Sequence, residues 1–194
     1  ALNNYVSTSL YNWSNLEGSN LNGVELELKK LDKRFENLKR IQNVFLNCFF
    51  ESSNTGNLFN QLTKDIQTDF SRYSYFYASY VSSSGKKEEA KNIVQSALKL
   101  YPRNLLLNQY KIDLNNTKNI NKFNCKKENH IVAEILYVAA NALSSQSLYP
   151  FSNFYLNLAK FLNEDFNSYD TLLAENFYKI NNFVKAKKIY KNLS

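Results

Sequence analysis

Apolar residues recur at helical spacing along most of this chain, and the clearest example lies between Ser71 and Ser83. The apolar positions there are three and four residues apart, which predicts one buried helix face made of Tyr73, Phe76, Tyr77, Tyr80 and Val81. Ser84 and Gly85 interrupt the pattern, and a second helix is expected from Lys86 to Leu100. Its buried face is expected to hold Ala90, Val94, Ala97 and Leu98. The two segments together predict a helical hairpin that ends before Pro102.

A spacing of small residues accompanies this hairpin and returns twice later in the chain. Ala78 is followed by a second small residue twelve positions later and by a third seven positions after that. The spacing recurs from Ala140 and again from Ala174, 34 residues further on, with Leu193 in the last position. Small residues let paired helices approach closely, and we expect that role for Ala78, Ala90, Ala97, Ala140, Ser152, Ala159, Ala174 and Ala186, with Pro102 between hairpins. A period of this length in a helical sequence predicts stacked hairpins.

The other predicted hairpins are less regular. In residues 133–164 the second helix begins near Pro150 and is expected to hold Tyr155, Leu156, Leu158, Ala159 and Leu162. In residues 167–194 the turn falls at Asn181-Asn182. Two more hairpins are expected, in residues 40–70 and in roughly residues 4–37. At the positions of the small residues, the first carries Leu46, Leu58 and Leu62, and the second carries Asn12, Val24 and Leu28.

These patterns predict an all-α chain of about five hairpins in three parts. Residues 1–104 form an N-terminal block of three hairpins, of which the first two are degenerate. Residues 105–132 hold a single helix, Leu105 to Leu114, followed by an irregular, mobile connector rich in Lys and Asn from Asn115 to Asn129. Residues 133–194 form a block of two hairpins, and we expect the array to continue beyond the given chain.

The composition limits the chemistry that the chain is expected to perform. With 194 residues and 44% apolar residues, the chain is expected to fold around a helical core. Its net charge of +7 is attributed to codon bias and a solvated helix surface, with attraction to acidic partners as the alternative. A single histidine excludes a histidine-based metal cluster, and four glycines are too few for a phosphate-binding loop. Cys48 is predicted to be a buried thiol, because it lies in an apolar run from Val44 to Phe50. Cys48 and Cys125 are too far apart in the sequence to indicate a disulfide framework. We therefore expect no enzyme, cofactor or metal site.

Two segments carry a family resemblance. Residues 77–102, YASYVSSSGKKEEAKNIVQSALKLYP, resemble the tetratricopeptide repeat in the three small residues and the terminal proline. Residues 130–194 are similar to paired repeats of long tetratricopeptide proteins of alphaproteobacteria, through Ala133-Glu134-Ile135-Leu136-Tyr137 and Leu158-Ala159-Lys160-Phe161-Leu162. The resemblance implies a right-handed superhelix and a soluble bacterial protein of the cytoplasm or periplasm. The uncharged stretch from Ile135 to Ala159 is predicted to be two amphipathic helices and not a membrane span.

The resemblance also implies a role as a protein-interaction scaffold. In this family the first helices of successive hairpins line a concave groove that binds an extended peptide or a partner helix. Groove candidates on the expected first helices are Arg40, Asn43, Asn47, Arg72, Tyr75, Ser79, Tyr137, Asn141, Glu175 and Tyr178. Arg40 and Arg72 resemble the cations that clamp a peptide carboxylate.

Two other functions stay open at this point. The first is self-assembly or docking within a larger protein, through a terminal repeat around residues 177–193. The second is RNA binding, favoured by the lysine cluster at Lys179, Lys185, Lys187, Lys188 and Lys191. Polar residues do not repeat regularly along the predicted groove, so a nucleic acid is not the expected partner.

Overall fold

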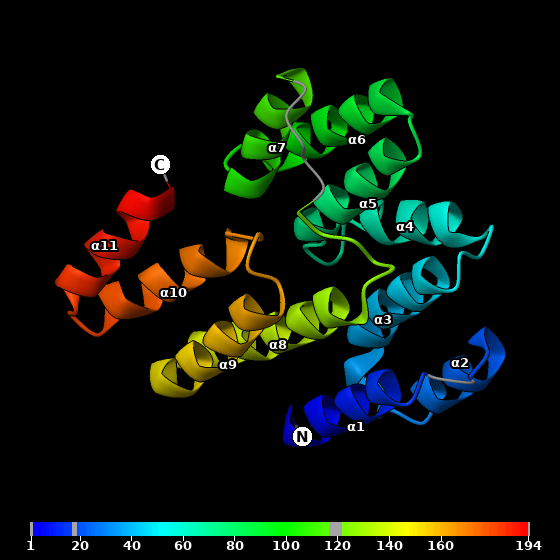
Figure 1. The fold of residues 1–194 in the computed structure, drawn as a ribbon, viewed down its shortest axis with the longest axis horizontal. Coiled ribbons are helices and arrows are strands. Elements are labelled where there is room, and N and C mark those ends of the chain that lie inside the picture. Colours follow the sequence, from blue (N-terminus) through cyan, green and yellow to red (C-terminus); the bar gives the residue numbers. More distant parts are fainter. Residues whose placement is uncertain (1, 17–18, 117–121, 194) are drawn as a thin grey trace. The chain divides into compact units, whose positions relative to one another are not determined.

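The computed structural model describes residues 2–16, 19–116 and 122–193, and within these ranges the regular elements are helices (Figure 1). They are α1 (Leu2–Ser14), α2 (Leu21–Lys29), the 3-10 helix η1 (Lys33–Phe35), α3 (Glu36–Phe49), α4 (Thr55–Thr63), α5 (Ser71–Ser83), α6 (Lys87–Leu100), α7 (Leu105–Asn115), α8 (Glu128–Ser145), α9 (Tyr149–Leu162), α10 (Ser168–Lys179) and α11 (Phe183–Leu193). The predicted all-α class is confirmed.

The chain divides into two compact units. The terminal unit combines Ala1–Ser19 with Lys127–Ser194 and therefore holds α1 and α8 to α11. The central unit is Asn20–Lys126 and holds α2 to α7. The sequence patterns predict three consecutive ranges, 1–104, 105–132 and 133–194. The terminal unit instead combines segments from both ends of the chain.

The terminal unit is built on two helical hairpins and one added helix. α8 pairs with α9, α10 pairs with α11, and α9 packs on α10 (Figure 1). α1 packs on α8 and buries the aromatic rings of Tyr5 and Trp13. Residues 4–37 are divided between the two units, because α1 belongs to this unit and α2 packs on α3 in the central unit.

The central unit repeats the same arrangement around an aromatic core. α3 pairs with α4 and α5 pairs with α6, while α4 packs on α5 and α7 covers α5 and α6. Phe45 of α3 makes edge contacts with Phe59 of α4 and Phe76 of α5, with ring centroids 6.4 and 5.4 Å away. The boundaries of α5 and α6 match the prediction to within one residue, and α7 occupies the single-helix segment predicted after Pro102.

One turn geometry closes all four hairpins. Glu51, Gly85, Ser147 and Asn181 have positive φ values of 54°, 82°, 61° and 60° at the end of the first helix. In each hairpin the next residue donates its N–H to the carbonyl five positions earlier, as in the bond from Leu148 to Leu143 at 2.9 Å. This is the Schellman helix ending. The turn residues within each pair of hairpins are 34 positions apart, so the turns follow the period that the small residues follow.

The small residues of the predicted spacing lie inside the hairpins. Ala78, Ala90, Ala97, Ala140, Ser152, Ala159, Ala174 and Ala186 are all buried, and Pro102 lies exposed just after α6. Leu158 departs from its predicted place on the core side of α9, since 38% of it is exposed. α9 carries apolar residues on both faces, and periodicity alone does not show which of two apolar faces is buried.

Two expectations about cysteine and the connector are wrong. Cys48 and Cys125 form a disulfide with a Cα–Cα distance of 5.9 Å, so Cys48 is not a free buried thiol. The end of the predicted connector is also not loose, because Phe123 and Cys125 are 5% and 8% exposed. The predicted mobility of residues 117–121 falls outside the described residues. Both errors have one cause: contacts between segments far apart in sequence leave no local periodic signal.

Candidate protein-binding surfaces

The groove candidates of the central unit make contacts inside that unit. Arg40 donates from Nη1 to Asp65 Oδ2 at 2.6 Å, and its guanidinium lies 5.2 Å from the ring centre of Phe70. The hydrogen bond from Arg40 lowers the pKa of the Asp65 carboxyl. Arg72 lies in the same way over the ring of Phe76, at 5.5 Å. Both arginines therefore brace the unit, and their part in a carboxylate clamp stays a prediction.

Three further candidates of this unit are buried. Asn47, Tyr75 and Ser79 are 2–3% exposed. Asn47 donates from Nδ2 to Glu25 Oε1 at 3.1 Å and to the carbonyl of Asn43 at 3.0 Å, which ties α3 to α2. The ring of Tyr75 meets that of Tyr110 edge-on at 4.8 Å, which ties α5 to α7. These side chains hold helices together in the structure.

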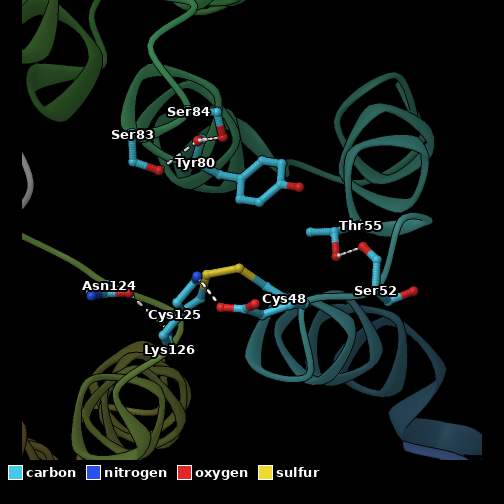
Figure 2. The surroundings of a disulfide bond; sticks show 10 residues. Cys48, Ser52, Thr55, Tyr80, Ser83, Ser84, Asn124, Cys125 and Lys126 are labelled. Carbon is cyan, nitrogen blue, oxygen red and sulfur yellow. Dashed lines mark hydrogen bonds and ion pairs between the residues drawn. A yellow bond between two sulfur atoms is a disulfide. The ribbon is translucent and has the colours of Figure 1, made fainter.

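Residues 122–126 of the same chain cover part of α3 and α5. The ring of Phe123 lies 5.3 Å from that of Phe45 and 4.3 Å from that of Phe76. The disulfide joins Cys125 to Cys48 of α3, and Lys126 forms an ion pair with Glu51. Figure 2 shows Cys125 joined to Cys48 of α3, with Asn124 and Lys126 on either side of Cys125 in the same segment. The chain itself thus occupies the surface between the two first helices of this unit.

The groove candidates of the terminal unit remain accessible. Tyr137 and Asn141 lie one turn apart on α8, and Glu175 and Tyr178 lie one turn apart on α10. Asn141 and Glu175 are exposed, and 58% of Tyr178 is exposed. Tyr137 is half-buried against the ring of Tyr169, at 5.8 Å. Four polar or amphipathic side chains therefore stand on the first helices of two consecutive hairpins.

A buried polar network fixes these two first helices relative to α9. Asn176 of α10 donates from Nδ2 to Ser152 Oγ and to Asn153 Oδ1, both at 2.8 Å. Its Oδ1 accepts a hydrogen bond from Ser144 Oγ of α8 at 2.6 Å. Asp170, which is 6% exposed, forms an ion pair with Lys160 of α9 at 2.7 Å. Because every polar atom of the Asn176 amide has a partner, the network holds α8, α9 and α10 in one arrangement.

A hollow of about 620 Å³ opens between α1, α8 and α9 in the terminal unit. Its apolar wall is made by Leu10 of α1, Val132 of α8 and Leu162 of α9, and Asn129 donates to the carbonyl of Leu162 at 2.9 Å. The sequence patterns do not predict this hollow, because the local pattern of residues 2–14 does not indicate that they pack on α8.

The described residues offer no arrangement typical of catalysis by a metal. Among residues 2–16, 19–116 and 122–193, no three His, Cys, Asp or Glu side chains lie together in a way that would hold a metal ion. Both cysteines form the disulfide, so neither provides a thiolate nucleophile. In the same part of the chain, no helix combines the length and the apolar character that crossing a membrane requires.

Comparisons with known proteins give no relative for this chain. No family model matches it, and neither a curated protein nor a solved structure matches it. The tetratricopeptide resemblance therefore rests on the spacing of small residues and on residues 130–194.

Proposed function

We propose that this protein is a non-catalytic interaction scaffold of the tetratricopeptide type, and that it binds an extended peptide or a partner helix. The binding surface is the exposed face of α8 and α10 in the terminal unit. The single observation that carries the proposal is the accessibility of Tyr137, Asn141, Glu175 and Tyr178 on the first helices of consecutive hairpins. In the central unit, the corresponding surface is covered by residues 122–126.

The side chains on this face suit peptide recognition. The amide of Asn141 can donate to and accept from a peptide backbone, as backbone groups of an extended segment require. Tyr137 and Tyr178 present large rings with a polar tip, and such residues contribute strongly at interfaces. The Asn176 network holds the helices before any ligand arrives, so little ordering would accompany binding.

The disulfide, rather than this face, supports a proposal for the location of the protein. Disulfides persist in oxidising compartments and are rare in the cytosol of most organisms. The Cys48–Cys125 bond closes a loop of 77 positions inside the central unit. Of the two expected locations, the periplasm is therefore the one we propose.

A peptide selection tests the proposed binding face. The full chain is immobilised and a random peptide library displayed on phage is selected against it, and the enriched peptides are then measured by titration. We expect Asn141→Ala with Tyr178→Ala to weaken binding at least about 5-fold, since loss of a tyrosine that is an interface hot spot costs more than about 1 kcal/mol. The control is Asn157→Ala, an exposed asparagine of α9 away from this face. Peptides that bind all three proteins equally, or no enrichment over a folded control protein, would contradict the proposal.

A further inference from the structure

The outward face of α9 is apolar over three helical turns. Phe151, Phe154, Leu158 and Phe161 are 63%, 59%, 38% and 75% exposed. They are spaced three, four and three residues apart, so they form one stripe along the helix. The opposite face of α9 is already buried, through Ser152, Leu156 and Ala159. The core of the terminal unit therefore does not use this second apolar face.

We propose that a second copy of this chain docks on this stripe, with the two α9 helices antiparallel about a two-fold axis. The stripe is symmetric about position 156: Phe151 and Phe161 lie five residues to either side, and Phe154 and Leu158 lie two residues to either side. An antiparallel copy in this register places Phe161 of the partner subunit opposite Phe151, and Leu158 of the partner subunit opposite Phe154. A two-fold interface requires such a self-complementary surface.

The area of the stripe matches that of a stable dimer. At about 200 Å² for each aromatic side chain, the exposed fractions give roughly 450 Å² of apolar surface on one copy. Two copies would bury about 900 Å² of apolar surface. A standard interface buries about 1,200–2,000 Å² in total, and somewhat over half of that area is apolar, so the two apolar areas agree. Patches of this size on one protein are commonly functional.

The charges of α9 favour a second copy over a lipid surface. Lys160 is the one charged residue of the helix, and it forms the ion pair with Asp170 of α10. The stripe therefore brings no like charges together across a two-fold axis. Helices that lie on membranes carry several lysines or arginines on their polar face, and α9 offers no cation beyond Lys160.

Sedimentation equilibrium of the full chain tests the proposed dimer. The unmodified protein, with a monomer mass of 22.6 kDa, is expected to form a dimer that dissociates on dilution. Phe154→Lys should weaken association at least about 100-fold, because it places two like charges near the axis. Val184→Lys is the matched control, since Val184 is 82% exposed on α11 and its change should leave the dimer intact.

The antiparallel register has its own test. Phe151→Glu combined with Phe161→Lys should keep the dimer, because each new charge then faces its opposite in the partner subunit. Phe151→Glu combined with Phe161→Glu should abolish the dimer, and circular dichroism should show both variants folded.

Three results would overturn the proposal. The first is a protein that stays monomeric at every concentration measured. The second is a dimer that survives Phe154→Lys but is lost with Val184→Lys, which would locate self-association at the terminal repeat. The third is a monomer that binds phosphatidylcholine vesicles through Phe154, which would make a lipid surface the occupant.

Discussion

Ser147 and Asn181, 34 residues apart, hold the same left-handed backbone conformation at the same point of two consecutive hairpins. Their φ values are 61° and 60°, and in both hairpins the following residue donates its N–H to the carbonyl five positions earlier. Glu51 and Gly85 are related in the same way in the central unit. A shared turn at a fixed period makes the four hairpins structurally equivalent, which is the basis for treating them as repeats.

Gly85 and Gly56 form a matched pair for testing this turn. At both positions, no heavy atom lies within 4 Å of the place where a Cβ would be, so an added methyl group meets no clash. Gly85→Ala should nevertheless destabilise the fold by about 1–2 kcal/mol, since its φ of 82° disfavours a side chain. Gly56→Ala, at the start of α4, should stabilise the fold by about 0.5–1 kcal/mol. Urea unfolding measures both, and equal effects would contradict the role assigned to the turn.

Asn176→Ala should destabilise the terminal unit. The substitution leaves the buried Ser152 and Asn153 without their donor, and an unsatisfied buried polar group costs about 1–3 kcal/mol. Thermal unfolding followed by circular dichroism would show the loss. Asn157→Ala provides the comparison, because an exposed change on α9 is expected to stay within about 0.5 kcal/mol. A loss no greater than that of the comparison would show that the network does not hold the helices.

Reduction should weaken the central unit. The disulfide joins positions 77 residues apart, and loss of such a cross-link costs about 2–4 kcal/mol. Urea unfolding with and without dithiothreitol measures the difference. The double variant Cys48→Ser with Cys125→Ser should match the reduced protein and show no further change with dithiothreitol. A native protein that reacts with iodoacetamide before reduction would contradict the disulfide itself.

His130 should make stability depend on pH below neutrality. Burial lowers the pKa of its imidazole below the ordinary 6.5, and the nearby Lys127 lowers it further. The unfolded chain therefore binds a proton more readily than the folded chain once the pH falls through 6.5, so stability decreases towards acid and levels off below the folded pKa. His130 is the single histidine of the sequence. Urea unfolding between about pH 5 and pH 7.5 should show this slope, and His130→Gln should remove most of it.

Local patterns predicted those parts of the fold that local contacts determine. The bounds of α5 match the prediction and α6 begins one residue later, because Gly85 and Pro102 are local signals that lie just beyond the ends of these helices. The buried positions of Ala78 and Ala140 follow from the close approach of helices within a hairpin.

Other features depend on contacts between distant segments, and sequence patterns did not predict them. The packing of α1 on α8 and the disulfide between Cys48 and Cys125 join segments far apart in the chain. The candidate site shows the same division. Ser79 and Asn141 have the same expected place on a first helix, one residue after Ala78 and Ala140, yet Ser79 is buried and Asn141 is exposed. Only the packing of neighbouring helices decides between these two outcomes.

Nuclear magnetic resonance can locate the proposed peptide-binding face on α8 and α10. The chain is labelled with ¹⁵N and titrated with a peptide selected on it, and amide shifts are mapped onto the helices. The largest shifts are expected to cluster around Tyr137, Asn141, Glu175 and Tyr178. Shifts confined to α9 and α11, or to the central unit, would contradict it.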